Sequence, residues 1–366
     1  MTKIPNDYNQ SKMGLLICTQ KIDRKDPVLG FFCNWVESLA KKFEKITVVC
    51  LHQGENNLPA NVVVLPLVQE ETNNPGIKLF SQGRRIIRFY KFIWQARNNY
   101  DVVFVHMNSE YIILGSLFWR IWRKGTALWY NHAQGNIRAK IAARVSNKIF
   151  CTSTDSFMAK YKKTRIMPVG VDVEKFKPSE TIRRRRNSIL FLGRIAPIKK
   201  LDLLIEALHL LKSRGVSFTA SIYGNPTAAD ENYYLDLKKS VRTAGLEREV
   251  SFYVGIPNYQ TPAIYASHDI FVNLSPDGLY DKTIFEAMAA GNLVISAHSN
   301  LRSKIDPRLM LEERNSKKLA AVLETVLNLD DKDRVGLRND LRYYVVQYHD
   351  LEILANRLEQ ELSSLT

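Results

Sequence analysis

The sequence predicts an α/β protein of two halves, each with its own parallel sheet, facing a central cleft. Apolar runs of strand length alternate with helical patterns along most of the 366 residues. Within each run nearly every residue is apolar, without alternation between apolar and polar residues, which is typical of strands buried on both faces of a parallel sheet. A stretch without apolar periodicity divides the chain near its middle. Ligands of such folds usually bind in the crevice at the carboxyl ends of the strands.

The first half, residues 1–166, is expected to form the N-terminal domain. Strands are predicted at 14–19, 45–51, 61–67, 101–107 and 126–132. Helices are predicted at Phe31–Phe43, Lys78–Asn98 and Tyr111–Lys124. This alternation is the signature of βαβ units.

Residues 167–187 are interpreted as an interdomain linker. The segment carries Pro168, Pro178 and four consecutive arginines, Arg183–Arg186. A run of like charges is usually solvated, so we expect these arginines to be exposed.

The second half repeats the scheme, and we place its domain at 188–340. Strands are predicted at 187–193, 218–224, 249–255, 269–275 and 292–297. Helices are predicted at Leu201–Ser213, Asn232–Ala244, Gln260–Ala266, Thr283–Ala290, Asn315–Leu329 and Asp331–Leu362. The end of the last helix, 341–366, is expected to pack back on the N-terminal domain.

Composition narrows the class of protein. With 45% hydrophobic and 24% charged residues, a disordered or collagen-like chain is excluded. Four cysteines without metal-ligand spacing are interpreted as reduced, buried thiols of a cytosolic protein. The N-terminal apolar run, 13–18, is too short for a signal sequence. The longest apolar stretch, Tyr111–Trp119, is too short to span a bilayer.

The net charge of +15 is concentrated in the first half. Residues 1–166 contain 25 Lys and Arg but only 11 Asp and Glu. The segment 83–98 predicts a basic amphipathic helix with Ile86, Ile87, Tyr90, Ile93 and Trp94 on its apolar face. We expect the helix to pack on its sheet while Phe89, Phe92 and the arginines meet an anionic membrane. Nucleic-acid binding is not expected, since no HTH, RNP or Cys/His signature accompanies the charge.

The stretch 191–208 places two cations at the end of a predicted strand. Gly193 and Arg194 follow the strand, and Lys199 precedes an amphipathic helix. Glycine permits close approach, free N–H groups at a helix start attract anions, and arginine binds phosphate bidentately. The pattern indicates a diphosphate site, although an ordinary strand–loop–helix with surface cations has the same form.

The stretch 273–297 runs from a strand through a polar loop into a helix beginning near Lys282 and Thr283. Backbone N–H groups at 280–283 are placed to meet phosphate oxygens. Glu286 is placed to accept hydrogen bonds from ribose hydroxyls, or it is simply an acid near a helix N-terminus.

Together these stretches resemble family 4 glycosyltransferases, which are retaining, nucleotide-sugar-dependent enzymes with two Rossmann-like domains, the GT-B architecture. The resemblance rests on GR-x4-K followed by D-x-LIEA, on E-A-M-A-x-G some 80 residues later, on PVGVDVEKF (168–176) and on the segment 250–276. It covers about residues 14–297 and implies sugar transfer to a glycan or lipid-linked acceptor in cell-envelope polysaccharide or glycoconjugate synthesis.

The resemblance assigns Arg194 and Lys199 to the donor diphosphate and Glu286 to the second acid of the family's E-x7-E motif. The first acid is replaced by Gly278, and Lys200 replaces the glycine usual after the motif lysine. The donor-binding set that we predict on the C-terminal domain comprises Gly193, Arg194, Lys199, Gly278, Tyr280, Asp281, Lys282, Thr283 and Glu286.

In the first domain, Gly30 matches a family glycine in the loop that approaches the donor phosphate and acceptor. His132 ends a predicted strand where the family often has a histidine facing the donor sugar, and His106 is a second histidine at a strand end. A lone glycine or histidine is more often structural.

No acid pair typical of a metal clamp, metalloprotease motif or P-loop is found, so we predict neither a metal nor a cofactor. Arg194, Lys199 and helix-end dipoles would then neutralise the leaving nucleoside diphosphate, which is UDP or GDP. The resemblance implies same-face attack, with the leaving phosphate taking the acceptor's proton; His132, Arg194 and Lys199 are the predicted catalytic residues.

Two alternatives remain open at this stage. One is a GT-B nucleotide-sugar epimerase. The other is a non-catalytic nucleotide- or membrane-binding relative with a decayed donor loop. Gly278, in place of the first motif acid, is the residue that supports this alternative. We expect a cytoplasmic protein with a peripheral association at the inner face of the cell membrane.

Overall fold

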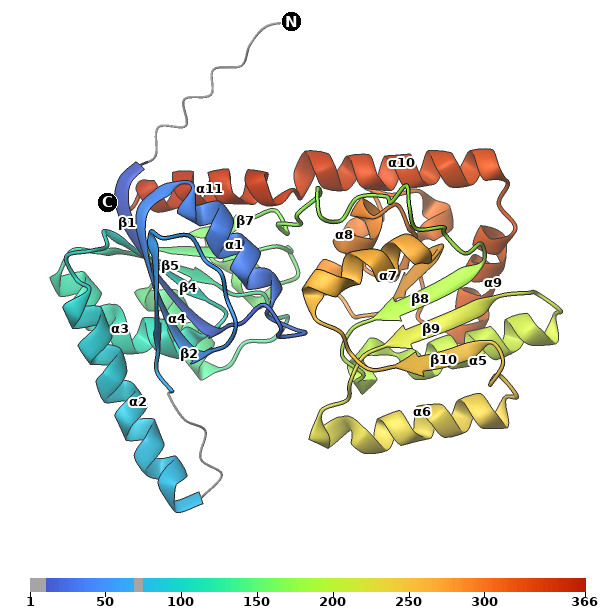
Figure 1. Cartoon of the computed structure of the whole chain (residues 1–366), viewed down its shortest axis with the longest axis horizontal. Coiled ribbons are helices and arrows are strands. Elements are labelled where there is room, and N and C mark those ends of the chain that lie inside the picture. The colour runs from blue at the N-terminus through green and yellow to red at the C-terminus, as the bar shows by residue number, and fades with distance from the viewer. Residues whose placement is uncertain (1–10, 69–74, 279) are drawn as a thin grey trace, which may run out of the picture. The chain divides into compact units, whose positions relative to one another are not determined.

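The computed structural model describes residues 11–68, 75–278 and 280–366, and it divides into two compact units (Figure 1). Unit 1 comprises Met1–Gly170 and Leu351–Thr366, and unit 2 comprises Val171–Asp350. The first ten residues of the predicted N-terminal domain lie outside the described part of the chain. Each unit is an α/β fold with a parallel sheet, as the sequence predicted.

Unit 1 is organised around a sheet of order β3-β2-β1-β4-β5-β6-β7, in which every neighbouring pair is parallel. Its strands are β1 (Ser11–Ile22), β2 (Phe43–Gln53), β3 (Val62–Pro66), β4 (Val102–His106), β5 (Gly125–Trp129), β6 (Lys148–Cys151) and β7 (Thr164–Ile166). The strands β1, β2, β4 and β5 are buried on both faces, which explains their continuous apolar sequence.

Helices cover both faces of this sheet and create two cores. The helices α1 (Phe31–Ala40) and α11 (Leu351–Ser363) pack on one face with Leu15 and Ile17 of β1. Three others, α2 (Pro75–Gln95), α3 (Ser109–Ile121) and α4 (Ile137–Val145), pack on the other face with Leu16 and Cys18. Alternate residues of one strand therefore serve opposite cores. All four cysteines are free and buried, as predicted.

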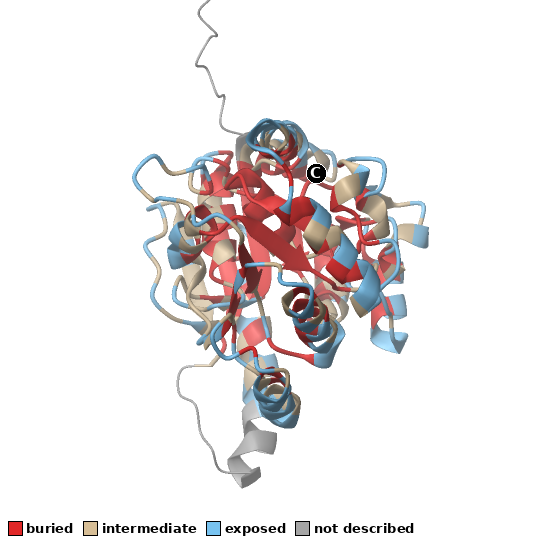
Figure 2. Ribbon diagram, turned by 90° about the vertical axis from the view of Figure 1, so that its right-hand side faces the viewer, coloured by how far each residue is buried: buried red, intermediate tan, exposed pale blue. Residues whose placement is uncertain are grey.

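Unit 2 has a five-stranded parallel sheet of order β10-β9-β8-β11-β12. The strands are β8 (Ser188–Leu192), β9 (Thr219–Tyr223), β10 (Val250–Tyr253), β11 (Ile270–Asn273) and β12 (Leu293–Ser296). The helices are α5 (Leu201–Ser213), α6 (Glu231–Thr243), α7 (Thr261–Ser267), α8 (Lys282–Ala289), α9 (Ser316–Leu327) and α10 (Asp331–Tyr348). Figure 2 shows the strands almost wholly buried and the outer helix faces exposed.

The single terminal helix predicted over 331–362 is wrong, because α10 ends at Tyr348 and α11 begins at Leu351. The carbonyl of His349 accepts a hydrogen bond from the Val171 amide at 2.8 Å, and Val171 forms an isolated parallel bridge with Asp350. This pairing takes the chain out of the helix. The segment expected to pack on the first domain from residue 341 belongs to unit 1 only from Leu351.

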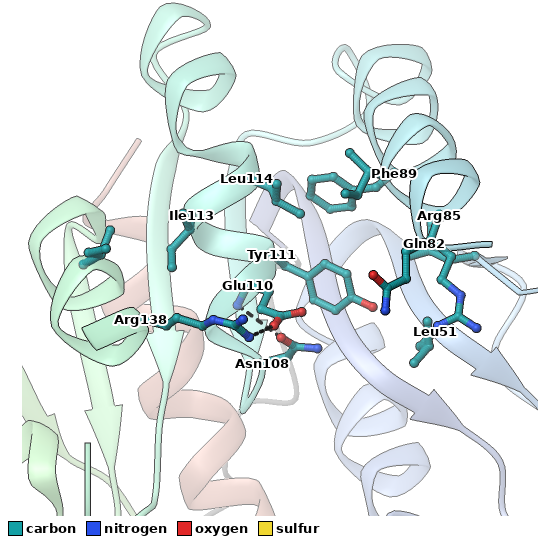
Figure 3. A pocket seen from close by; sticks show the side chains of 13 residues that line it. Leu51, Gln82, Arg85, Phe89, Asn108, Glu110, Tyr111, Ile113, Leu114 and Arg138 are labelled. Atoms are coloured by element: carbon teal, nitrogen blue, oxygen red, sulfur yellow. Dashed lines mark hydrogen bonds and ion pairs between the residues drawn. The ribbon is translucent and has the colours of Figure 1, made fainter. Parts of the chain in front are cut away.

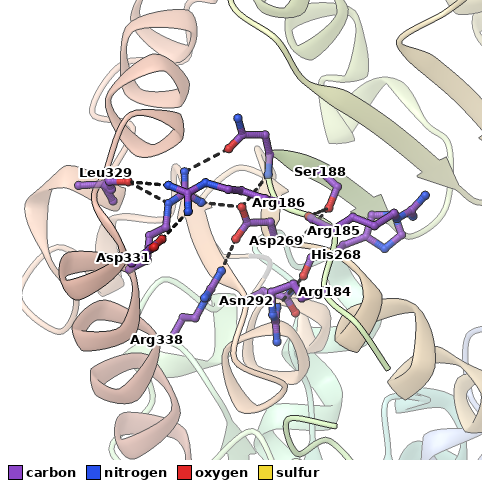
Figure 4. A network of polar contacts seen from close by, with 12 residues as sticks. Arg184, Arg185, Arg186, Ser188, His268, Asp269, Asn292, Leu329, Asp331 and Arg338 are labelled. Atoms are coloured by element: carbon purple, nitrogen blue, oxygen red, sulfur yellow. Dashed lines mark hydrogen bonds and ion pairs between the residues drawn. The ribbon is translucent and has the colours of Figure 1, made fainter. Parts of the chain in front are cut away.

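The interpretation of the linker arginines as exposed is wrong for Arg184, which is half-buried, whereas Arg183, Arg185 and Arg186 are exposed as predicted (Figure 4). Arg184 donates to the carbonyls of His268, at 2.6 Å, and Ala290, at 2.9 Å. Arg185 lies 2.8 Å from His268 Nε2. The segment is therefore anchored to unit 2, because the Arg184 guanidinium satisfies backbone carbonyls where α7 and α8 end and Arg185 contacts the His268 ring.

A buried ion pair lies beside this anchor. Asp269 is 0% exposed and lies 2.6 Å from Arg334 Nη1, and Arg338 forms a second pair with the same carboxylate. The backbone amide of Asn187 also donates to Asp269, at 2.9 Å. These contacts join the start of β8 to α10 (Figure 4).

The α2 helix is rotated relative to the sequence-based expectation. Its packing residues are Phe89 and Ile93, with Ala96 just after the helix, whereas Ile87 and Trp94 are 70% and 52% exposed. Phe89 thus belongs to the core and cannot meet a membrane. The spacing i, i+4, i+7 fits the predicted residues Ile86, Tyr90 and Ile93 as well as Phe89, Ile93 and Ala96. Periodicity alone therefore did not distinguish the two faces.

Candidate active site

The predicted donor-binding residues gather at the carboxyl edge of the unit 2 sheet. The strands β8 and β11 are neighbours in that sheet, so the loops that follow them meet at one edge. The loop after β8 carries Arg194 and Lys199, and the loop after β11 leads to Asp281 and the first turn of α8. Open parallel sheets bind ligands at this edge.

Gly193 follows β8 at a point where the backbone just after the neighbouring strand β9 comes close. A Cβ placed on Gly224, just after β9, would lie 2.0 Å from the carbonyl oxygen of Gly193. Arg194 follows directly, and its exposed guanidinium makes no hydrogen bond or ion pair with the described residues. The site therefore presents one uncommitted cation beside a close-packed glycine turn.

Lys199 is committed to a carboxylate. It lies in a 3₁₀ turn, Pro197–Lys199, and its Nζ is 2.6 Å from Asp281 Oδ2 and 3.1 Å from Ser275 Oγ. The same Asp281 oxygen accepts hydrogen bonds from Ser275, at 2.5 Å, and Asn273, at 2.9 Å. Burial alone would raise the pKa of Asp281, but Lys199 and these two donors hold it below its usual value.

Lys200, at the position where the family resemblance led us to expect glycine, adopts a left-handed backbone with φ 56° and ψ 41°. This conformation is strained for a residue with a Cβ, so glycine would suit the position better. The turn nevertheless delivers the chain into α5.

Glu286 is 2% exposed on the second turn of α8. Its two oxygens accept hydrogen bonds from Asn258, at 3.0 Å, and Tyr265, at 3.2 Å. Burial raises the pKa of Glu286, and Lys282 works in the opposite direction. Each oxygen keeps a second lone pair for a ligand hydroxyl. Sequence reasoning missed Asn258 and Tyr265, because only the fold brings them to Glu286.

Lys282 and Thr283 begin α8 and are both half-buried. Burial lowers the pKa of Lys282 to about 8, against the opposing effects of Glu286 and Asp172. The start of α8 thus combines the backbone amides of a helix N-terminus with an ammonium group, which together favour an anion.

The loop before α8 departs from the family pattern in a specific way. Gly278 is buried with φ 82°, a left-handed conformation in which a glutamate would be strained. The Tyr280 ring, predicted to bind the donor, is 8% exposed and packs 4.7 Å from Phe285 and 4.6 Å from His298 between ring centroids. Tyr280 therefore serves packing in this structure.

Arg314 is a further residue that the sequence did not indicate. Its guanidinium donates to the carbonyls of Leu274, Ser275 and Ala297 at 3.0 to 3.3 Å. It also lies 3.7 Å from Asp277, whose Oδ1 accepts from the Ser299 amide at 2.8 Å. The arginine holds the loop after β11 in place. Its local sequence, LEERNS, contains no pattern that predicts this role.

The remaining predicted residues belong to unit 1. Gly30 precedes α1, and a Cβ there would lie 2.6 Å from the carbonyl oxygen of Asp26, so close packing alone requires glycine. His132 follows β5, its ring centroid lies 5.0 Å from that of Tyr130, and partial loss of solvation lowers the pKa of its imidazole. His106 is buried and stacks on Phe32 at 4.1 Å, which makes it a core residue.

Two family models match the chain. The model described as Glycosyl transferase 4-like matches residues 28–153, and the model described as Glycosyl transferases group 1 matches residues 172–345. The chain belongs to the family 4 type of GT-B glycosyltransferases.

Two curated relatives of this family 4 chain match over part of their length. Mannosylfructose-phosphate synthase of Agrobacterium fabrum is 31% identical over 40% of this chain and 35% of its own length. The GDP-mannose-dependent alpha-(1-6)-phosphatidylinositol monomannoside mannosyltransferase of Mycolicibacterium smegmatis is 29% identical over 36% of this chain and 38% of its own length. The matched part thus spans little more than a third of these relatives.

A solved structure agrees in fold over the full length. Anabaena HepE in complex with UDP and glucose superposes with a TM-score of 0.76 at 17% identity, covering 96% of this chain and 100% of that chain. At this identity the likeness shows the GT-B fold alone. Within the described residues, no helix is both long and apolar enough to cross a membrane.

Proposed function

We propose that the protein is a retaining glycosyltransferase that moves a hexose-type sugar from a nucleotide-diphosphate sugar to a glycan or lipid-linked acceptor. The observation that carries this is the set of groups on neighbouring loops at the carboxyl edge of the unit 2 sheet: Arg194, the Lys199–Asp281 pair and the start of α8. The names of relatives that use GDP-mannose, or bind UDP and glucose, support a UDP- or GDP-linked donor.

In this proposal Arg194 and Lys199 bind the donor diphosphate, with the amides of Lys282 and Thr283 beside them. Glu286, held by Asn258 and Tyr265, accepts hydrogen bonds from the ribose hydroxyls. The positive charge of Arg194 and Lys199, together with the amides at the start of α8, stabilises the leaving diphosphate, so the proposed reaction requires no metal or other cofactor. Chelation by EDTA should leave transfer unchanged.

The proposed reaction retains the configuration at the anomeric carbon. The bond from that carbon to the diphosphate oxygen breaks as the acceptor oxygen attacks from the same face. The acceptor's proton passes to the departing phosphate oxygen, so no protein nucleophile is needed. We also propose His132 as a catalytic residue and Gly30 as a donor-binding residue of this scheme.

Nucleotide binding tests the donor site directly. Thermal unfolding is followed with UDP, GDP, ADP, dTDP and their sugar conjugates. A ligand at 100 times its dissociation constant stabilises the native state by about 2.7 kcal/mol. We expect one base to raise Tm, with loss of the shift in Arg194→Ala and no loss in Arg214→Ala, whose side chain pairs with Glu324 on the surface.

The result also separates the remaining candidates. A nucleotide shift without transfer to any acceptor, but with rearrangement of the sugar, would identify an epimerase. Absence of a shift with every nucleotide would favour the non-catalytic relative, which the buried Gly278 in place of an acid supports.

We further propose that unit 1 associates peripherally with the inner, cytoplasmic face of the cell membrane. Between residues 82 and 145 the sequence has eleven Lys or Arg against two acids, Asp101 and Glu110. The helices α2, α3 and α4 of this region expose large apolar side chains. These are Ile86, Ile87, Trp94, Leu117, Ile121, Ile137, Ile141 and Val145, which we call the α2–α4 surface.

Exposed apolar groups interleaved with cations favour an anionic lipid surface. We expect co-sedimentation with vesicles containing phosphatidylglycerol, and weaker binding as salt screens the attraction. Failure to bind such vesicles at low salt would remove the membrane part of the proposal and leave the donor site untouched.

A further inference from the structure

A pocket of about 570 Å³ opens in unit 1 between α2, α3 and α4 (Figure 3). Its lining includes Leu51 near the end of β2, Leu67 just after β3 and Asn108 just after β4. The pocket therefore lies at the carboxyl edge of the sheet, where parallel α/β folds bind ligands.

Three polar side chains converge on this pocket. Gln82 and Arg85 come from α2, and Tyr111 comes from α3 with its hydroxyl directed toward them (Figure 3). Within the ranges that the structure describes, none of these side chains has a hydrogen bond or ion pair. The Tyr111 ring is held in place by stacking on Phe89, with 5.4 Å between centroids.

The neighbouring cations are committed elsewhere. Arg88 donates to the Leu67 carbonyl at 2.7 Å, and Arg138 forms an ion pair with Glu110. Because the Arg138 and Glu110 charges cancel, Arg85 gives the pocket one net positive charge. A pocket whose free donors are a guanidinium, an amide and a phenol suits a phosphate group with hydroxyls beside it.

The pocket is continuous with the α2–α4 surface. Ile86 and Ile141 line the pocket and are also 41% and 38% exposed, so they belong to both. A ligand held by Arg85 would therefore extend over apolar side chains at the rim. That combination of an anionic head and an apolar chain is a lipid.

We propose that this pocket binds the phosphate-bearing head of a lipid, with Arg85 on the phosphate, Gln82 and Tyr111 on the head group, and the chain over Ile86 and Ile141. The role of this lipid as the sugar acceptor rests on the proposed function. The binding itself does not, because it uses unit 1 residues alone.

The probe is dihexanoyl phosphatidate, used below its micelle concentration and titrated by calorimetry. We expect saturable binding of one lipid per chain. Because a hydrogen bond to a charged group contributes about 1.5–3 kcal/mol, Arg85→Gln should weaken binding about tenfold or more. Tyr111→Phe should weaken it by a smaller factor, about twofold to fivefold.

Arg84→Gln is the matched control, because Arg84 is the adjacent exposed cation of α2 and does not line the pocket. It should leave binding of the single lipid within about twofold, since exposed cations contribute little. Equal losses in the two arginine variants would overturn the proposal, since they would show general surface attraction.

Inorganic phosphate and dihexanoyl phosphatidylcholine separate the head from the chain. Phosphate that binds as tightly as phosphatidate would reduce the site to a phosphate site and refute the lipid. Equal binding of the zwitterionic lipid would refute recognition of the anionic head. A normal nucleotide shift in Arg85→Gln shows that the variant is folded, and tells a failed lipid site from a failed donor site.

Discussion

The Lys199 ammonium and the Asp281 carboxylate form an ion pair of 2.6 Å that joins the loop after β8 to the loop before α8. The two side chains are only 14% and 21% exposed. The cation proposed for the donor diphosphate is thus already positioned by a carboxylate, which itself rests on Ser275 and Asn273.

Lys199→Ala should destabilise unit 2 by about 2 kcal/mol, because it leaves a largely buried carboxylate without its cation. Adding Asp281→Asn should recover part of that loss. Urea unfolding of the two single variants and the double variant gives the coupling, for which we expect about 1–2 kcal/mol. Purely additive losses would show that the pair contributes no interaction.

Lys200→Gly should stabilise the protein by about 0.5–1 kcal/mol. The left-handed backbone at Lys200 costs an L-residue about 1–2 kcal/mol, and the extra freedom of glycine in the unfolded chain offsets part of that gain. Lys238→Gly, in the middle of α6, is the control and should lose about 1 kcal/mol. Losses of the same sign at both positions would refute the strain argument.

Asp269→Asn should cost about 3–5 kcal/mol, since it leaves the buried Arg334 guanidinium without its counter-charge. Asp331→Asn removes the acid that pairs with Arg186 and should change stability by less than about 1 kcal/mol, because that acid is 81% exposed. Denaturant midpoints of the two variants check the difference. Comparable midpoints would mean that the Asp269 pair contributes no more than a surface contact.

Unfolding should depend on pH through His268. Burial, together with Arg185 and Arg184, lowers the pKa of His268 to about 4, although the Ile264 carbonyl acts in the other direction. The unfolded chain takes up a proton near pH 6.5, whereas the folded chain does so only near pH 4. Stability is therefore complete above pH 6.5 and falls as the pH drops from 6.5 toward 4.

The size of this effect follows from the pKa difference. Between pH 7 and pH 5 we expect a loss of about 2 kcal/mol from this group, at 1.36 kcal/mol per pKa unit. Urea unfolding at pH 7, 6 and 5 measures it, and His268→Gln should remove that part of the slope. An unchanged slope in the variant would assign the pH dependence to other groups, such as His349, whose pKa burial also lowers to about 4.

The predicted strands and the helices of the two sheets were confirmed where the apolar runs were long and continuous, as in β4 and β11. The short strands β6 and β7 and the alanine-rich α4 were missed. The run predicted for β11, 269–275, has four apolar residues among seven, whereas β6 has only Ile149–Cys151 and β7 only Ile166, which is too little pattern to distinguish a strand from a loop. The break at His349 was invisible for another reason, since it depends on a backbone partner, Val171, far away in sequence.

The candidate site divides in the same way. Arg194, Lys199 and Glu286 could be found because they lie in short motifs next to strand ends. Arg314 could not, because its sequence neighbourhood carries no pattern. Asn258 and Tyr265 lie in the segment 250–276, but its resemblance to the family gave neither residue a role, and only the folded chain brings them to Glu286.

The return of α11 to unit 1 reverses the order in which the two units can be completed. Unit 2 is one continuous segment, whereas the core of unit 1 includes Leu354, Leu358 and Leu362 from the last residues of the chain. During synthesis the domain that begins first is therefore the last to be finished. A frameshift or stop codon after residue 350 would spare the donor half and leave the N-terminal core with an open apolar face.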